Sequence, residues 1–167
     1  LGVFWDEIEQ YRSQNANTRA GERLEYWRKS SAFVAEAPVI GHGTGSIREL
    51  FHRSTIGRTG VSALAADNPH NQTFAVALQL GILGIAALYA LWIAHLRLFR
   101  GYGIAAWLGL IVVVQNVVGS LFNSHLFDFT QGWTYVFGVG VLGGMVLRQA
   151  GAGSEADHKQ PSGFLGR

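Results

Sequence analysis

The chain has no cysteine and, from residue 74 to residue 147, almost no charge. The lack of cysteine excludes disulfide bonds and thiolate metal sites, although it does not decide the compartment. Arg97, Arg100 and Asp128 are the only formal charges in that stretch. A soluble helix bundle needs a charged face on each helix to meet water, so this part of the sequence favours membrane helices.

Three apolar runs fill the low-charge stretch, and the charged residues fall between them. A helix needs about 20 apolar residues to cross the hydrocarbon core of a bilayer. The runs therefore predict transmembrane helices at about residues 74–96, 103–122 and 128–147. We expect an all-α membrane protein, a polytopic helical bundle fragment with about three transmembrane helices.

Positive charges predict the orientation, because Lys and Arg gather in short cytoplasmic loops. Arg97 and Arg100 follow the first run and Arg148 follows the last, so these ends should face the cytoplasm. The gap 123–128 has no Lys or Arg and should lie outside, together with residues 1–72. The tail 149–167 is rich in Gly, Ser and charge, and we expect it to be a disordered cytoplasmic tail.

The first 72 residues carry most of the charge and should form a mostly helical loop outside the membrane. Good helix formers over residues 22–36 predict a helix that Pro38 ends, and a short helix is expected over 47–52. No signal peptide is present and the chain begins at Leu1, which indicates a C-terminal piece of a longer polytopic protein. Remaining N-terminal transmembrane helices are therefore expected as partners.

Alternating glycines mark residues 38–46, which read Pro-Val-Ile-Gly-His-Gly-Thr-Gly-Ser. Glycine allows unusual backbone angles and a close approach to another group, and we interpret the segment as a tight connector. The alternative is a nest of backbone N–H groups for phosphate oxygens, with Gly43 and Gly45 as supporting residues. The spacing matches neither the dinucleotide-binding nor the P-loop pattern.

A polar turn, Asn68-Pro69-His70-Asn71-Gln72, stands directly before the first apolar run. It places an imidazole at the mouth of a membrane span, where a lipid-linked substrate could meet a water-facing one. This position indicates catalysis at a bilayer surface. The alternative is that His70 caps the following helix with Asn68 or Asn71.

Four motifs occur in one order: Arg23-Leu24-Glu25-Tyr26-Trp27, the segment 37–46, Asn68-Pro69-His70-Asn71 and Leu80-Gly81-Ile82-Leu83-Gly84. Together they resemble the O-antigen ligase and O-antigen polymerase superfamily of bacterial membrane proteins, from about Asn17 through the last predicted span. The resemblance is to the C-terminal part of that fold, with its large periplasmic loop and last transmembrane helices. It implies a lipid-linked glycosyltransferase-type fold in the bacterial inner membrane, multi-pass, with residues 1–72 in the periplasm.

The resemblance also implies a reaction, the transfer of a glycan from undecaprenyl diphosphate to an acceptor hydroxyl on the periplasmic face. The acceptor is the lipid A-core in ligases, another repeat unit in polymerases, and Ser or Thr in protein O-glycosylases, and the sequence does not choose among them. An inverting, metal-independent enzyme without a cofactor is implied. The expected partners are the lipid-linked glycan, its acceptor and membrane lipid, with no nucleic acid, and the fragment alone should be inactive.

Three side chains fit this chemistry. His70 is the candidate catalytic base, since an unperturbed imidazole titrates near pH 6.5 and is largely neutral at neutral pH. Arg23, which matches the family's Arg before Trp, is the candidate diphosphate clamp, and Arg19 could replace it. Asn71 is a possible supporting residue. Alternatively, Arg23 pairs with Glu22 or Glu25 on a helix surface, a weak exposed interaction.

Two other function classes stay open, a transporter half and a structural scaffold for envelope polysaccharide assembly. A transporter should carry charged or unwound segments at mid-membrane, and these runs show few. A scaffold predicts that His70 and Arg23 can both be replaced harmlessly. Within the runs, Gln115 and Asn116 are expected to bond between helices.

Overall fold

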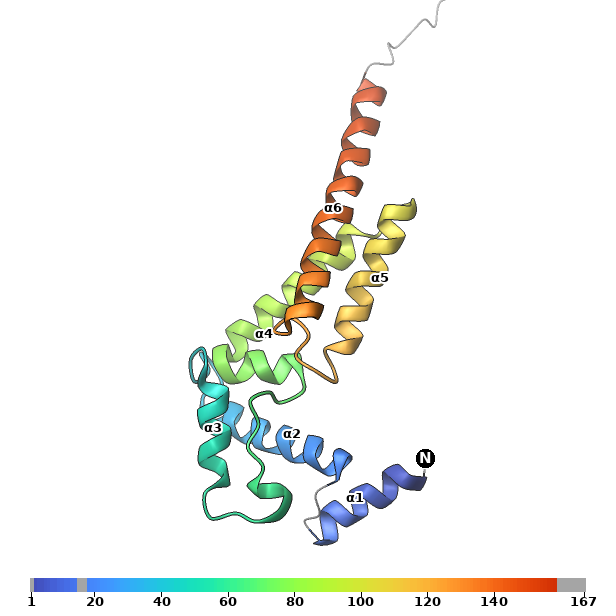
Figure 1. Cartoon of the computed structure of the whole chain (residues 1–167). Coiled ribbons are helices and arrows are strands. Elements are labelled where there is room, and N and C mark those ends of the chain that lie inside the picture. Colours follow the sequence, from blue (N-terminus) through green and yellow to red (C-terminus); the bar gives the residue numbers. More distant parts are fainter. Residues whose placement is uncertain (1, 15–17, 159–167) are drawn as a thin grey trace, which may run out of the picture.

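The structure, a computed structural model, describes residues 2–14 and 18–158, and over these residues it contains helices and no strand. The expected all-α class is confirmed for the described part of the chain. Figure 1 shows α4, α5 and α6 as a bundle, with α1, α2 and α3 gathered at one end of it. In chain order the elements are α1 (Gly2–Gln14), α2 (Arg19–Glu36), α3 (Ser46–Thr55), a 3₁₀ turn η1 (Gly60–Ala63), α4 (Gln72–Leu98), α5 (Ile104–Gly119) and α6 (Phe129–His158).

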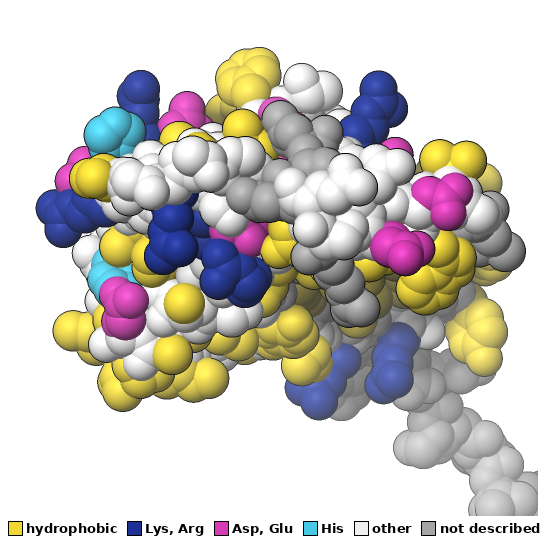
Figure 2. Space-filling view, turned by 90° about the horizontal axis from the view of Figure 1, so that it is seen from below, with side chains coloured by type: hydrophobic (Ala, Val, Ile, Leu, Met, Phe, Trp, Pro, Cys, Tyr) yellow, Lys and Arg dark blue, Asp and Glu magenta, His cyan; other side chains and the backbone are white. Residues whose placement is uncertain are grey.

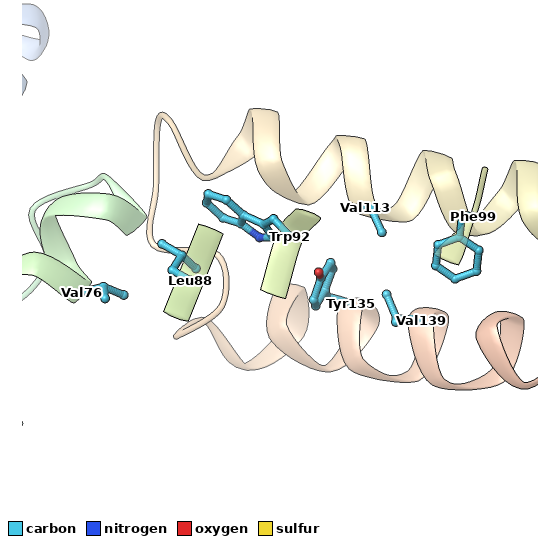
Figure 3. Packing of buried hydrophobic residues seen from close by; sticks show 7 residues of the cluster. All are labelled: Val76, Leu88, Trp92, Phe99, Val113, Tyr135 and Val139. Carbon is cyan, nitrogen blue, oxygen red and sulfur yellow. The ribbon is translucent and has the colours of Figure 1, made fainter. Parts of the chain in front are cut away.

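The three apolar runs form α4, α5 and α6, which share one hydrophobic cluster. Figure 3 shows most of its side chains lying between the three helices, with Val113 from α5 facing Val139 from α6 and Val76 set apart on the first part of α4. Glycines allow the helices to approach closely, since a Cβ atom on Gly138 of α6 would lie 3.1 Å from a methyl group of Val112 of α5. The cluster consists of Val76, Leu88, Trp92, Phe99, Val113, Tyr135 and Val139.

Many large apolar side chains of this bundle point outward, which is unusual for a soluble monomer. They include Ile82 and Leu83 on α4, Trp107 on α5 and Phe137 on α6. Among the described helices, one is long and apolar enough to cross a membrane, α4, with a mean hydropathy of 2.1 over its best window. Helix α5 is apolar but has 16 residues, fewer than the about 20 that a span needs. The bundle fits a helical membrane protein, and the number of spans stays a prediction.

Residues 1–72, which include α1–α3, carry most of the charged residues of the chain, and Figure 2 shows charged side chains of both signs on the face seen from this end of the bundle. Helix α2 includes the predicted helix 22–36 and begins earlier, because the Thr18 hydroxyl accepts a hydrogen bond from the Gly21 amide and caps it. Helix α3 similarly extends the predicted helix 47–52. The sequence did not predict α1, which packs against α2.

A buried carboxylate, Glu25, joins these elements. Its side chain is 1% exposed and accepts hydrogen bonds from the Tyr11 hydroxyl of α1, at 2.9 Å, and from the Arg28 guanidinium, at 2.6 and 2.9 Å. The bond with Arg28 holds the pKa of Glu25 below its usual value, although burial opposes this. Lys29, also buried, donates to the carbonyl oxygens of Ser62 and Leu64 and so fixes η1 against α2.

Helix α4 is broken at Gly81, whose φ of 60° and ψ of −151° are not helical. The carbonyl groups that the break frees accept hydrogen bonds from the segment 38–45, here called the glycine loop. The His42 amide donates to the Leu78 oxygen at 2.8 Å, and the Gly43 amide donates to the Gln79 oxygen at 3.0 Å. In return, the Ile82 amide donates to the Pro38 oxygen at 2.8 Å. An unwound position therefore exists inside the first predicted span. Unwound segments at mid-membrane are typical of transporters, and the sequence predicts few of them.

Helix α6 continues to His158, whereas the sequence placed the end of the last helix near residue 147 and predicted a disordered tail from residue 149. Residues 149–158 therefore form helix in the structure. Gly151 and Gly153 weaken a helix but do not end this one. The rest of the predicted tail, 159–167, lies outside the described residues.

The two polar residues of α5 that are expected to bond between helices have different outcomes. Asn116 is 2% exposed and accepts a hydrogen bond from the Trp92 indole N–H at 3.3 Å, which confirms the expected contact between helices. Gln115 beside it is exposed. On α6, Gly140 and Gly144 have open space at their Cβ positions, and two small residues at this spacing let a further helix approach closely.

Candidate functional site

The polar turn, residues 68–72, lies between the helices α1–α3 and the connection from α5 to α6, residues 120–128, here called the α5–α6 turn. Asn71 caps α4, since its side-chain oxygen accepts a hydrogen bond from the Phe74 amide at 3.0 Å. Its side-chain nitrogen donates to the Leu121 oxygen at 3.0 Å. The Gln72 amide also donates to the Ser120 oxygen at 2.9 Å. Residues 71 and 72 thus bond the start of α4 to the α5–α6 turn.

The His70 side chain is exposed, and its backbone φ is 52°. A positive φ is uncommon for any residue other than glycine and costs energy. The Asn68 side-chain oxygen stabilises this turn by accepting the His70 amide at 2.8 Å. The cap of α4 is Asn71, so the alternative in which the His70 side chain serves as a helix cap does not describe this structure.

Two neighbours hold the imidazole ring of His70. The Tyr26 ring of α2 stacks on it, with centroids 6.0 Å apart and an angle of 29° between the planes. The Nδ1 atom lies 3.3 Å from the Asn123 side-chain oxygen, in the α5–α6 turn. Burial, with the Glu22 carboxylate, raises the pKa of Tyr26 above its ordinary value, so its phenol is neutral at neutral pH.

A cleft of about 410 Å³ lies beside α2, between α1 and the α5–α6 turn. Both candidate diphosphate residues, Arg19 and Arg23, are exposed and lie along this cleft. We call it the arginine cleft, and it is lined by Glu7, Arg19, Ala20, Arg23, Leu24, Trp27 and Phe122.

The arginine cleft and His70 share two structural supports. Arg23 and Tyr26 stand about one turn apart on α2, and Tyr26 stacks on His70. On the other side, Phe122 lines the cleft and is followed by Asn123, which contacts the imidazole. The structure thus brings the candidate base and the candidate diphosphate residues to the same end of the bundle.

The structure does not contain the alternative in which Arg23 pairs with Glu22 or Glu25 on the surface of α2. Glu25 is occupied by Arg28 and Tyr11, and no ion pair of Arg23 or Arg19 occurs within the described residues. Two other arginines of the outer segment are paired, Arg48 with Asp67 at 3.5 Å and Arg53 with Glu49 at 2.6 Å.

The glycine loop acts as a connector. Its His42 and Gly43 amides donate to carbonyl oxygens of α4, and the Gly45 amide donates to the Gln79 side-chain oxygen at 2.8 Å. The His42 ring also contacts the Phe33 carbonyl oxygen through Nε2, at 2.8 Å. These amides are bonded within the chain, which matches the connector interpretation of Gly43 and Gly45.

A family model described as O-antigen ligase matches residues 2–89, more than half of the 167-residue chain. The chain belongs to the O-antigen ligase family. This confirms the resemblance carried by the four motifs, and the match begins before the first motif and ends within α4. The family is membrane-associated, and its general activity is of the ligase or glycosyltransferase type. One apolar helix of the chain, α4, fits that setting.

A similar protein of Haemophilus influenzae, described as uncharacterized, is 27% identical over 84 residues. The match covers 50% of this chain and 21% of that relative. The matched part of the chain therefore corresponds to about a fifth of the length of that relative.

Sequence reasoning did not assign a role to Tyr26 or Asn123 in this candidate site. Tyr26 belongs to the first of the four motifs, so its position beside Arg23 was visible in the sequence. Asn123 is separated from His70 by 53 positions, and no spacing rule connects them. His125 and Asp128 lie in the α5–α6 turn, as loop residues. Within the described residues, no group of three or more His, Asp or Glu side chains could hold a metal ion.

Proposed function

We propose that this chain forms the outer-face half of the active site of a membrane enzyme that transfers a glycan from undecaprenyl diphosphate to an acceptor hydroxyl. The favoured acceptor is the lipid A-core, as in ligases, and the runner-up is a growing glycan chain, as in polymerases. Residues 1–72 would then face the periplasm and α4–α6 would lie in the inner membrane. The observation that carries the proposal is that His70 lies at the same end of the bundle as a cleft lined by two arginines that form no ion pair within the described residues, and that Tyr26 of α2 stacks on His70 about one turn from Arg23.

The base in this proposal is His70. Its exposed imidazole would accept the proton of the acceptor hydroxyl as the hydroxyl oxygen attacks the anomeric carbon of the donor sugar. The carbon–oxygen bond to the diphosphate breaks in the same displacement, and the electron pair leaves with the diphosphate. One displacement inverts the configuration at that carbon.

The leaving diphosphate would be held by Arg23, with Arg19 beside it. A guanidinium stays charged and offers a planar fork to phosphate oxygens. The lining of the arginine cleft has two guanidinium groups, neither of them in an ion pair within the described residues, against the single carboxylate of Glu7, so the cleft offers positive charge to a ligand. The apolar walls of the cleft, from Trp27 and Phe122, suit the isoprenoid end of such a donor.

The experiment uses the full-length protein in a strain that lacks its own copy, with protein levels in the membrane matched. His70→Ala and Arg23→Ala are compared with wild type by the gel ladder of surface glycan. His52→Ala and Arg53→Ala serve as controls, since both residues lie exposed on α3.

We expect His70→Ala to abolish the ladder while lipid-linked precursor accumulates, and we expect Arg23→Ala to reduce it strongly. Loss of the lipid A-linked ladder indicates a ligase, whereas a change in chain length indicates a polymerase. A normal ladder in both variants would overturn the proposal and favour a scaffold.

A further inference from the structure

We propose that Asn123 and Asn68 act as positioning residues that fix the tautomer of His70, so that its Nε2 atom carries the free electron pair. This inference rests on the proposed role of His70 as the base. It follows from one chain of hydrogen bonds in which the first donor is unambiguous.

The first link is the orientation of the Asn68 side chain. The oxygen and nitrogen of an amide are distinguished by their partners. The His70 backbone N–H can only donate, and it lies 2.8 Å from one terminal atom of Asn68, so that atom is the oxygen. The Ser124 hydroxyl donates to the same oxygen at 2.7 Å.

The second link is the orientation of Asn123. The side-chain oxygen of Asn68 faces the His70 backbone amide, so the side-chain nitrogen of Asn68 faces the other way and must donate. It donates to a terminal atom of Asn123 at 3.2 Å, and an atom that accepts from an amide nitrogen is the oxygen. The Asn123 backbone is itself held, since its amide donates to the Gly119 oxygen at 3.1 Å.

The third link is the imidazole. The same Asn123 oxygen lies 3.3 Å from Nδ1 of His70. An oxygen acceptor needs a proton on Nδ1, and a neutral imidazole carries only one proton. Nε2 is therefore left as the acceptor, which is the form that a general base requires.

The hydrogen bonds of Asn68 and Asn123 also fit the protonated form of the His70 imidazole. When Nε2 takes the proton of the acceptor hydroxyl, Nδ1 keeps its own proton and its bond to Asn123, so no side chain has to rotate. Tyr26 is the titratable side chain that packs on the ring, and its raised pKa keeps it uncharged. In other enzymes, a hydrogen bond to the second ring nitrogen holds a catalytic imidazole in one tautomer, and loss of that tautomer lowers kcat strongly.

The test measures kcat and KM of the purified full-length enzyme, with a lipid-linked glycan donor and its acceptor, as a function of pH. Asn68→Asp is the sharpest variant, because a carboxylate of the same shape still accepts from the His70 amide. This carboxylate cannot donate to the Asn123 side chain. The Asn123 side-chain amide would then rotate, so that its nitrogen faces both the new carboxylate and the imidazole. That nitrogen would oblige Nδ1 to accept and would place the proton on Nε2.

We therefore expect Asn68→Asp to lower the high-pH plateau of kcat by about tenfold or more, with little change in KM. Asn123→Leu should have a similar effect. Asn123→Asp should keep the plateau within about threefold, because a carboxylate also accepts from Nδ1. The acid limb of the pH–kcat curve of Asn123→Asp should move to higher pH, because the new negative charge stabilises the imidazolium.

Different outcomes separate the two proposals. If His70→Ala retains full activity, the proposed function fails. If His70→Ala is inactive but Asn68→Asp and Asn123→Leu have wild-type plateaus, the base stands and the tautomer inference is overturned. If Asn123→Asp is as slow as Asn123→Leu, Asn123 does not act as an acceptor, and the inference is again overturned. Unfolding temperatures identify a variant that is misfolded. If Asn123→Leu is misfolded, the kcat of Asn68→Asp decides whether the tautomer inference stands.

Discussion

Gly41 and Gly81 bring the backbone of the glycine loop into direct contact with the backbone of α4. A Cβ atom on Gly41 would lie 2.4 Å from the carbonyl carbon of Gln79, and one on Gly81 would lie 2.4 Å from the carbonyl carbon of Val39. Both glycines have positive φ values, 67° and 60°. The break in α4 thus depends on two positions that exclude every side chain, and it supplies the acceptors that hold the glycine loop.

Replacing either glycine should therefore destabilise the protein. We expect Gly41→Ala and Gly81→Ala each to cost about 3 kcal/mol, from a strained φ and a clash with backbone that cannot move away. The unfolding temperature in detergent and the amount of protein in the membrane measure the effect. Gly101→Ala is the matched control, since open space surrounds its Cβ position and its φ is not positive, and it should be neutral. An unchanged unfolding temperature in Gly81→Ala would show that α4 is not broken there.

The buried carboxylate predicts an acid-sensitive contact between α1 and α2. Because the pKa of Glu25 is lowered in the folded protein, the folded state binds its proton less tightly than the unfolded state. Its contribution to stability is complete above a pH of about 4.5 and is lost as the pH falls below that value. We expect Glu25→Gln to destabilise the protein by about 2 kcal/mol at pH 7.

The check is the difference in unfolding temperature between wild type and Glu25→Gln from pH 7 down to pH 3.5. That difference should shrink below a pH of about 4.5. Glu49→Gln is a suitable control, since Glu49 forms an exposed pair with Arg53 on α3, and such pairs contribute little. A difference that stays constant over this range would contradict the assignment.

The helices could be predicted where the sequence carries local signals. Good helix formers before Pro38 predicted α2, and the apolar runs predicted α4 to α6. The break at Gly81 could not be predicted, since an isolated glycine is common in membrane helices. What distinguishes Gly81 is the glycine loop, whose amides come from a segment more than thirty positions away.

The candidate site was predictable to a similar degree. His70, Arg19 and Arg23 were found because they lie in motifs or beside them, and the structure places them at one end of the bundle. Their partners were not found, because Asn123 and Phe122 reach the site through the packing of α5 against α4 and α6. Local sequence identifies reactive groups, whereas the groups that orient them depend on long-range contacts.

The hydrogen bond between Trp92 and Asn116 should couple α4 to α5. A bond between side chains of membrane helices is worth about 1 kcal/mol. In a double-mutant cycle of Trp92→Phe and Asn116→Ala we expect a coupling energy of this size, measured by unfolding in mixed micelles. Gln115→Ala is the control, because Gln115 is exposed beside Asn116. Additive effects of the two substitutions would exclude the bond.

The arginine cleft predicts graded effects on donor binding. A hydrogen bond to a charged group contributes about 1.5–3 kcal/mol, so Arg23→Ala should raise the KM for the lipid-linked donor about tenfold or more. Arg23→Lys keeps the charge without the planar fork and should give an intermediate value. Arg19→Ala combined with Arg23→Ala should exceed either single change, since both line one cleft. Arg53→Ala should match wild type, and a donor KM that no cleft variant alters would remove the cleft from the site.

The orientation can be tested with single cysteines, because the chain has none of its own. In a full-length protein made cysteine-free, Glu36→Cys should react with a membrane-impermeant maleimide in cells with a permeabilised outer membrane. Gln149→Cys should react only after the inner membrane is opened. Both positions are exposed in the structure, so burial does not account for a difference. The bundle places the Arg97 end of α4 and the Arg148 region of α6 opposite α1–α3 (Figure 1), as the distribution of positive charge requires. Labelling of Gln149→Cys in closed cells would reverse the orientation and move His70 to the cytoplasmic face, where a periplasmic acceptor could not reach it.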